Sequence, residues 1–127
     1  MIVVDASTAV LGLLNDGDAR RILVDETLAV PHLVDAEVVQ AVRGQLLRGA
    51  ITAGDGQKAV ATWARLGLQR FSLVGLLERV WDLRDNLSAY DACYVALAES
   101  LACALVTADA RISRAHGPRC AITVVRG

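Results

Sequence analysis

Short runs rich in β-branched residues alternate with longer helix-like stretches along the chain, and this alternation constrains the fold more than any other feature. The strand-like runs are residues 2–4, 28–30, 69–73, 104–106 and 122–125. The helix-like stretches lie near 7–15, 17–25, 33–48, 53–66, 75–84 and 88–102. Strands that alternate with helices form mostly parallel sheets covered by helices on both faces, and near-continuous apolar runs are typical of such buried strands. We therefore predict an α/β protein with a mostly parallel sheet of about five strands.

The size and charge of the chain limit the kinds of partner that it can bind. With 127 residues, of which 54% are apolar, it can bury one core, and we expect a single domain over residues 1–127. The net charge of −1 argues against a protein that coats nucleic acid nonspecifically. Residues 110–127 nevertheless contain four arginines and no acid. This segment is either a solvated charged surface or a local patch that faces phosphate.

The beginning of the chain and its cysteines indicate where the protein works. The first residues, MIVVDAS, lack the basic region of a secretory signal and reach a charge at Asp5. No stretch approaches the roughly 18 apolar residues of a membrane span. The cysteines, Cys93, Cys103 and Cys120, are odd in number and lack the C-x-x-C spacing of a zinc site. We expect a soluble cytoplasmic protein with reduced thiols and no membrane partner.

Two acids follow strand-like runs. Asp5 comes directly after residues 2–4, and Asp109 lies three residues after residues 104–106. In open α/β sheets, ligands bind outside the carboxyl ends of the strands, so both positions suit a functional site. The simpler interpretation is that each acid caps the helix or turn that follows it.

Two further acids lie in predicted helices. Glu37 shares a helix face with the small residues Ala41 and Gly44, which leave room beside it, although a lone Glu on a solvated face is ordinary. Asp91 follows Ser88 by three residues, which is the spacing of a capping box, but it also borders the apolar run that follows. Capping and ligand binding are both open for Asp91.

If these four acids converge, they need a cation. Two unit negative charges about 4 Å apart repel by roughly 4 kcal/mol at an effective dielectric of about 20. Carboxylates are ligands that Mg²⁺ or Mn²⁺ prefers, whereas zinc would favour a set with His or Cys. His32 and His116 lie outside these motifs and are interpreted as structural or surface residues. The pattern therefore favours a site for a hard divalent ion.

The segments IVVDAS, PHLVDAEVVQAV, LSAYDACYVALAE and LVTADARI together resemble the PIN domain, and within it the VapC-type toxins of bacterial toxin–antitoxin pairs. The resemblance runs over nearly the whole chain and implies a three-layer α/β/α sandwich whose acids bind Mg²⁺ or Mn²⁺ and cleave RNA. The positions that match the family's acids are Asp5, Glu37, Asp91 and Asp109. Ser7 and Thr107 match its small hydroxyl residues. Gln40 replaces a frequent Asn, and no further acid follows Asp109 in its motif, so the number of metal ions is left open.

The resemblance also implies roles and partners. Asp5 and Asp91 would bind the metal, Asp109 would bind it directly or through water, and Glu37 would act through water. Ser7 and Thr107 would hold the carboxylates, and Arg111 and Arg114 are candidate contacts to the RNA backbone. A VapB-type antitoxin and a homodimer are implied, and cleavage of RNA would inhibit translation and growth.

Other functions share part of this pattern. A PIN-domain RNA-processing nuclease that is not a toxin would use the same chemistry. A non-catalytic PIN-like module would be expected to lack some of the acids. A phosphoryl-transfer enzyme of the haloacid-dehalogenase kind would need a second Asp where this chain has Ser7.

Overall fold

The sheet consists of parallel strands in the order β3-β2-β1-β4-β5. The structure is a computed structural model and describes residues 1–126. The strands are β1 (Ile2–Val4), β2 (Leu28–Pro31), β3 (Gln69–Phe71), β4 (Leu105–Thr107) and β5 (Ile122–Val124). The prediction of a mostly parallel sheet of about five strands is confirmed, with ends that shift by one or two residues.

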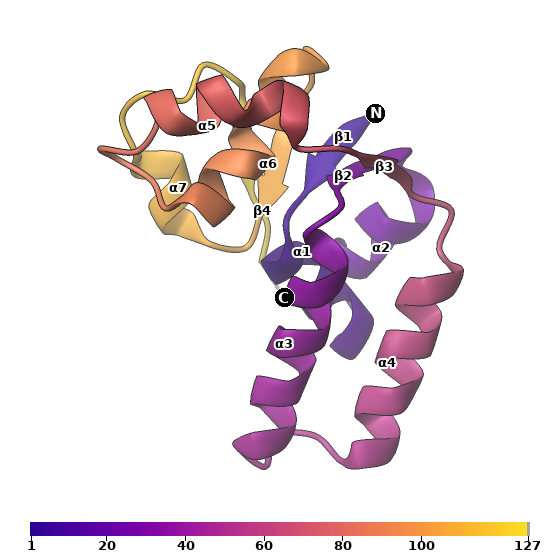
Figure 1. The fold of residues 1–127 in the computed structure, drawn as a ribbon. Helices are drawn as coiled ribbons and strands as arrows, with labels where there is room; N and C mark the ends of the chain where they lie inside the picture. The colour runs from indigo at the N-terminus through magenta and orange to yellow at the C-terminus, as the bar shows by residue number, and fades with distance from the viewer. Residues whose placement is uncertain (127) are drawn as a thin grey trace.

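Helices cover both faces of this sheet. They are α1 (Ala6–Leu14), α2 (Asp18–Asp25), α3 (Val34–Leu47), α4 (Ala53–Arg65), α5 (Leu77–Asp82), α6 (Ala89–Ser100) and α7 (Ala110–Arg114), with a short 3₁₀ helix η1 (Val74–Leu76) before α5. The chain moves outward from β1 to β3 and then crosses back to β4 and β5. Because crossovers share one hand, this reversal puts α1–α4 on one face and α5–α7 on the other, as Figure 1 shows. The predicted three-layer α/β/α sandwich is confirmed.

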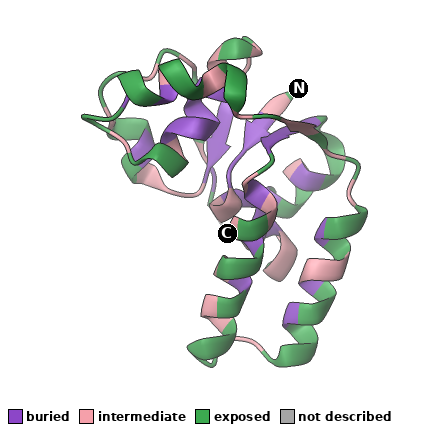
Figure 2. Cartoon of the chain, viewed as in Figure 1, coloured by how far each residue is buried: buried purple, intermediate pink, exposed green. Residues whose placement is uncertain are grey.

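The core lies between the sheet and its two helix layers. All residues of β2 are buried, which explains why this run is apolar without alternation. In the helix layer formed by α5–α7, residues 92–98 of α6 are buried without interruption, and α6 packs across β1, β2 and β4. Figure 2 shows the burial concentrated in the strands and in α6. α6 is therefore anchored in the core from residue 92 onward, while its first turn lies at the surface.

Local signals explain where several helices begin and end. Gly49, after α3, has a φ of +74°, a conformation that glycine adopts readily. Thr52 then starts α4 with a complete capping box, because its hydroxyl accepts from Asp55 N–H and the Asp55 carboxylate accepts from Thr52 N–H. The resulting α3–α4 hairpin projects beyond the sheet (Figure 1). Pro31 is the last residue of β2, and the five-residue helix α7 lies outside the helix-like stretches of the sequence.

The reversal of strand order creates a crevice between β1 and β4. The chain leaves β1 toward one face and leaves β4 toward the other, so the carboxyl ends of these neighbouring strands lie open between two helices. Such a switch point is where open α/β sheets bind ligands. Asp5 and Thr107 lie at the ends of these strands. Within residues 1–126, no helix is long and apolar enough to cross a membrane.

Gly12 allows α2 to pack closely on α1. A Cβ atom at Gly12 would lie 2.6 Å from Leu23 Cδ1 and 3.0 Å from the Ala19 carbonyl carbon. We expect Gly12→Ala to lower the free energy of unfolding by about 1–3 kcal/mol, because the backbone of α2 would have to move. At Gly44, in α3, a Cβ would meet only the flexible end of Arg48, at 3.4 Å. Gly44→Ala should therefore raise stability by up to about 1 kcal/mol. Urea denaturation of both variants checks this, and effects of the same sign would contradict it.

Candidate functional site

Asp5 is a buried carboxylate that is held by three hydrogen-bond donors. Only 5% of the residue is exposed. The carboxylate accepts from Thr8 N–H at 3.1 Å, from the Ser7 hydroxyl at 2.7 Å and from the Thr107 hydroxyl at 2.6 Å. The first of these bonds makes Asp5 the N-cap of α1. The prediction that Asp5 caps the following helix is thus correct, but capping accounts for only one of its three hydrogen bonds.

Ser7 and Thr107 link the β1–α1 junction to the β4–α7 junction. While donating to Asp5, the Ser7 hydroxyl accepts from Ala108 N–H at 3.0 Å, and the Thr107 hydroxyl accepts from Asp109 N–H at 3.0 Å. The two hydroxyl oxygens are 3.4 Å apart. This network fixes the direction of the Asp5 carboxylate and the path of the chain into Asp109.

Glu37 lies in the first turn of α3 and is bound by a residue that sequence reasoning gave no role. The hydroxyl of Tyr94, on α6, donates to Glu37 Oε1. Burial raises the pKa of Glu37, and repulsion from Asp91 and Asp5 raises it further, against the effect of the Tyr94 hydrogen bond. Tyr94 is itself buried, and burial and its bond to Glu37 raise the pKa of the phenol. The available signal for Tyr94 was its position one helical turn after Asp91.

Asp91 lies in the first turn of α6. Its backbone N–H donates to the Ser88 hydroxyl at 3.1 Å, which confirms Ser88 as the N-cap. Burial raises the pKa of the Asp91 carboxyl, and the charges of Asp109 and Asp5 raise it further, while Arg111 has a smaller opposing effect. The carboxylate thus carries a charge in a partly buried position among other acids.

Asp109 is the N-cap of α7 and is paired with Arg111. The Arg111 guanidinium donates to both carboxylate oxygens, with Nη2–Oδ2 at 2.6 Å and Nε–Oδ1 at 3.0 Å. This bond lowers the pKa of Asp109, and the nearby charge of Arg114 acts in the same direction. Arg111 and Arg114 are both exposed. Arg111, which the sequence suggested as an RNA contact, therefore already has an acidic partner in this conformation.

The acids come close enough to repel one another but do not surround a single point. Asp5 and Asp91 influence Glu37, and Asp5 and Asp109 influence Asp91. In the part of the chain that the structure describes, no three Asp, Glu, His or Cys side chains are arranged to hold one ion together. Asp109 would have to release Arg111 to become a ligand. The donor set, which is carboxylate oxygen throughout, fits Mg²⁺ or Mn²⁺ and does not fit zinc.

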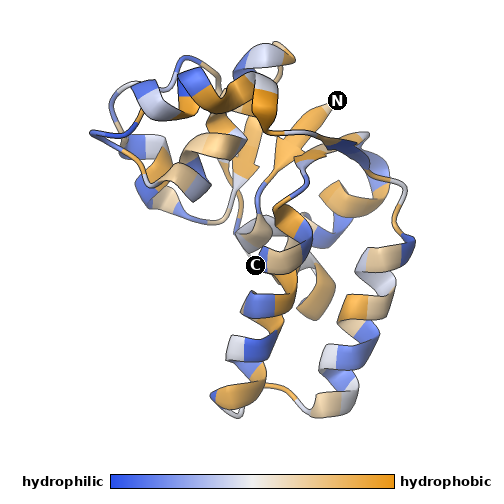
Figure 3. Ribbon diagram, in the orientation of Figure 1, coloured by the Kyte–Doolittle hydropathy of each residue, from blue (hydrophilic) through white to orange (hydrophobic). Residues whose placement is uncertain are grey.

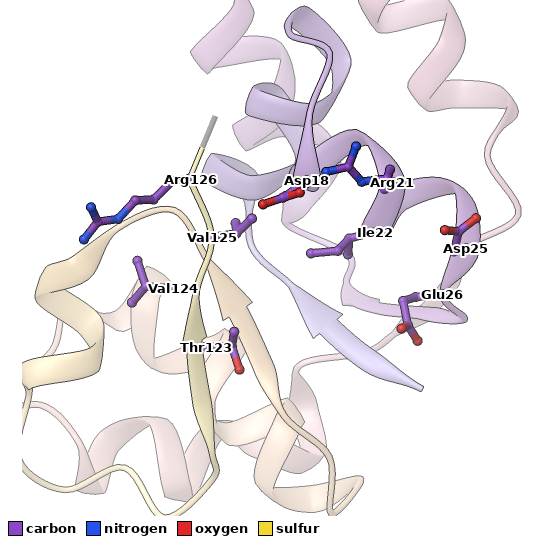
Figure 4. A pocket seen from close by; sticks show the side chains of 9 residues that line it. All are labelled: Asp18, Arg21, Ile22, Asp25, Glu26, Thr123, Val124, Val125 and Arg126. Atoms are coloured by element: carbon purple, nitrogen blue, oxygen red, sulfur yellow. Dashed lines mark hydrogen bonds and ion pairs between the residues drawn. The ribbon is translucent and has the colours of Figure 1, made fainter.

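Two clefts differ in their relation to the hydrogen-bond network around Asp5. A cleft of about 480 Å³ between α1 and α3 includes Ser7 and Ala108 of that network in its lining. A second cleft, of about 610 Å³, lies between α2 and the end of the chain, where Ile22 points toward Val125 (Figure 4). None of the four acids lines either cleft, but only the first is lined by residues of the hydrogen-bond network around Asp5. The cleft beside Ser7 is therefore the one that can serve the same site.

Comparison with known proteins identifies the family. The PIN domain matches residues 2–118. Over 125 residues, the chain is 56% identical to Ribonuclease VapC9 from Mycobacterium tuberculosis, and 98% of each protein is covered. The chain belongs to the VapC family of PIN-domain proteins.

Solved structures agree with this VapC assignment at the level of the fold. PAE2754 from Pyrobaculum aerophilum has a TM-score of 0.69 and 26% identity, with 97% of this chain and 83% of that chain covered. A chain of the VapBC2 structure from Rickettsia felis, bound to a DNA fragment from the promoter, has a TM-score of 0.71 at 15% identity. The match covers 99% of this chain and 100% of that chain. The VapC resemblance predicted from the sequence is confirmed.

The raised pKa of Asp91 gives a test of whether its carboxylate supports the fold. The pKa of Asp91 is higher in the folded chain than the ordinary value of 3.8, which applies to the unfolded chain. Between these two pKa values the folded state therefore binds more protons than the unfolded state. The free energy of unfolding then falls as pH rises through that window. Without metal, Asp91→Asn should be more stable than the wild type at pH 7, and the gain should disappear below about pH 4.

Ser88→Ala is the matched control for this experiment. It removes the bond that caps α6 and should cost about 1 kcal/mol at both pH values. Thermal unfolding in the presence of a chelator measures both variants. A loss of about 1 kcal/mol for Asp91→Asn at pH 7 would instead make Asp91 chiefly a capping residue.

Proposed function

We propose that this VapC-family protein is a Mg²⁺- or Mn²⁺-dependent endoribonuclease that hydrolyses RNA phosphodiester bonds. The observation that carries the proposal is the buried Asp5 at the β1–β4 crevice, held by Ser7 and Thr107 beside acids whose pKa values are raised by burial and repulsion. A divalent cation relieves that repulsion. The name of the 56% identical relative, a ribonuclease, supports RNA as the substrate.

The four acids would divide the work of holding the ion. Asp5 and Asp91 would bind it directly, Asp109 would bind it directly or through water once Arg111 moves away, and Glu37 would orient water. A bound Mg²⁺ or Mn²⁺ supplies positive charge for the phosphoryl oxygens and makes bound water more acidic. Ser7 and Thr107 would keep Asp5 in one orientation while it binds. No side chain of this set needs to attack the phosphorus itself.

The RNA would lie across the carboxyl ends of β1 and β4. Arg114 is exposed in α7 and near enough to lower the pKa of Asp109, so its guanidinium can reach a phosphate beside the acids. Arg111 would join it when it leaves Asp109. The cleft beside Ser7 offers space for a nucleotide next to the cleaved bond.

We further propose that the protein is the toxin of a VapBC-type pair that works in the cytoplasm and inhibits translation and growth by cleaving RNA. The fold relative from Rickettsia felis is part of a VapBC2 pair, which supports a VapB-type antitoxin as partner. Large apolar side chains are exposed on α3, at Val39 and Leu47, and near α5, at Val74, Leu77 and Trp81. Figure 3 shows apolar segments in both of these helical regions. Such surfaces suit an antitoxin and a second copy of the chain in a homodimer.

Metal removal and loss of Asp5 should each abolish RNA cleavage. Asp5→Asn keeps an N-cap for α1 but removes the negative charge, so the fold should persist while cleavage falls by about 100-fold or more. Purified protein is incubated with structured RNA in Mg²⁺, in Mn²⁺ and in excess chelator, and the products are separated by electrophoresis.

Asp25→Asn is the matched control, because Asp25 is an exposed acid at the end of α2 that takes no part in the cluster. It should cleave like the wild type. Cleavage that continues unchanged in chelator or in Asp5→Asn would rule out the proposed chemistry. A small antitoxin-like reading frame next to the gene would separate a toxin from an RNA-processing nuclease.

Arg114→Ala should weaken RNA binding without slowing the bond-breaking step. Removing one phosphate contact should raise KM, leave kcat unchanged and reduce the slope of log affinity against log salt by about 1. Arg65→Ala is the control, since Arg65 is exposed at the far end of α4. Equal salt slopes for Arg114→Ala and the wild type would exclude the contact.

A further inference from the structure

Tyr94 is a deeply buried residue whose hydroxyl makes a hydrogen bond to Glu37. The residue is 2% exposed and belongs to the continuous buried run of α6. Its hydroxyl donates to Glu37 Oε1, on a helix from the opposite side of the crevice. Among the described residues, no buried side-chain oxygen or nitrogen is left without a partner, so this bond satisfies the phenol.

The bond joins two helices that carry acids of the site. Asp91 and Tyr94 are three residues apart on α6, so they lie on the same side of that helix. Glu37 is on α3, which reaches the crevice from the other helix layer. α6 therefore supplies one carboxylate itself and holds a second one in place.

Glu37 needs such a restraint. The charges of Asp5 and Asp91 both act on it, and a half-buried carboxylate on a helix can rotate away from two like charges. Tyr94 bonds Oε1, so in the proposed site Oε2 would be the oxygen that orients water. A phenylalanine would fill the same space but would leave Glu37 unrestrained.

We propose that Tyr94 is a positioning residue that fixes the Glu37 carboxylate in its working orientation. This inference rests on the proposed ribonuclease function. It concerns the placement of Glu37 and not proton transfer by the phenol. Partners that orient metal-site carboxylates typically contribute 10- to 100-fold to activity or metal affinity.

Tyr94→Phe is the direct test. We expect kcat for RNA cleavage to fall about 10- to 100-fold and Mn²⁺ binding to weaken, with KM close to the wild-type value. The melting temperature should stay within about 5 °C of the wild type, because the ring still fills the core. Tyr90→Phe is the matched control, since Tyr90 is on the same helix with 66% of its surface exposed. It should behave like the wild type.

A double-variant cycle separates positioning from packing. In the Glu37→Ala background, Tyr94→Phe should cause no further loss of Mn²⁺ affinity. It should also raise the melting temperature of that background, because the buried hydroxyl without a partner is removed. An equal loss of affinity with and without Glu37 would show that Tyr94 acts through packing and would overturn the inference.

The two proposals fail in different ways. If the wild type cleaves RNA in a metal-dependent manner and Tyr94→Phe has the same kcat and Mn²⁺ affinity, the inference on Tyr94 is wrong and the proposed function stands. If the wild type itself neither binds Mn²⁺ nor cleaves RNA, the proposed function is wrong, and the role of Tyr94 falls with it.

Discussion

The placement of a buried carboxylate between β1 and β4 is the constraint on which the rest of the site depends. Removing an ionised carboxylate from water is costly unless hydrogen bonds replace the lost hydration. Asp5 has three such bonds, and two come from hydroxyls that are in turn held by backbone N–H groups of the β4–α7 junction. The bonds that offset the cost of burying the Asp5 carboxylate also link the ends of β1 and β4, where the strand order reverses.

The four acids share a second physical feature, which is that each stands at the beginning of a helix. Asp5 and Asp109 are N-caps of α1 and α7, and Glu37 and Asp91 lie in the first turns of α3 and α6. The positive end of the helix dipole and the free backbone N–H groups stabilise a negative charge at such positions. In a parallel α/β fold, the helices after the strands begin at one edge of the sheet. Topology thus brings the acids together, and the helix ends offset part of their repulsion.

Much of this arrangement could be predicted from the sequence because it depends on short-range rules. The alternation of strand-like and helix-like segments predicts the parallel sheet, and parallel strands put Asp5 and Asp109 at one edge. The pairing of Arg111 with Asp109 could not be predicted, because it depends on α7, whose five residues are too few to show a helical period. The bond between Tyr94 and Glu37 joins residues 57 positions apart. It depends on how two helix layers are placed around the crevice, which no local pattern contains.

A pattern that occurs twice in the chain shows how a capping motif and a functional position can be told apart. Thr52 and Asp55 form a complete capping box at the start of α4. The Asp55 carboxylate is exposed and accepts from the backbone N–H of Thr52, and this bond lowers its pKa. At α6, Ser88 accepts from the N–H of Asp91 as Thr52 does from Asp55, but burial and neighbouring acids raise the pKa of the Asp91 carboxyl. The backbone N–H of Asp91 makes the capping bond to Ser88, and the contact of the Asp91 carboxyl with Ser88 is the smallest of the influences on its pKa. In the proposed function this carboxylate binds the divalent ion, and the ion would offset the cost of placing the charge beside other acids.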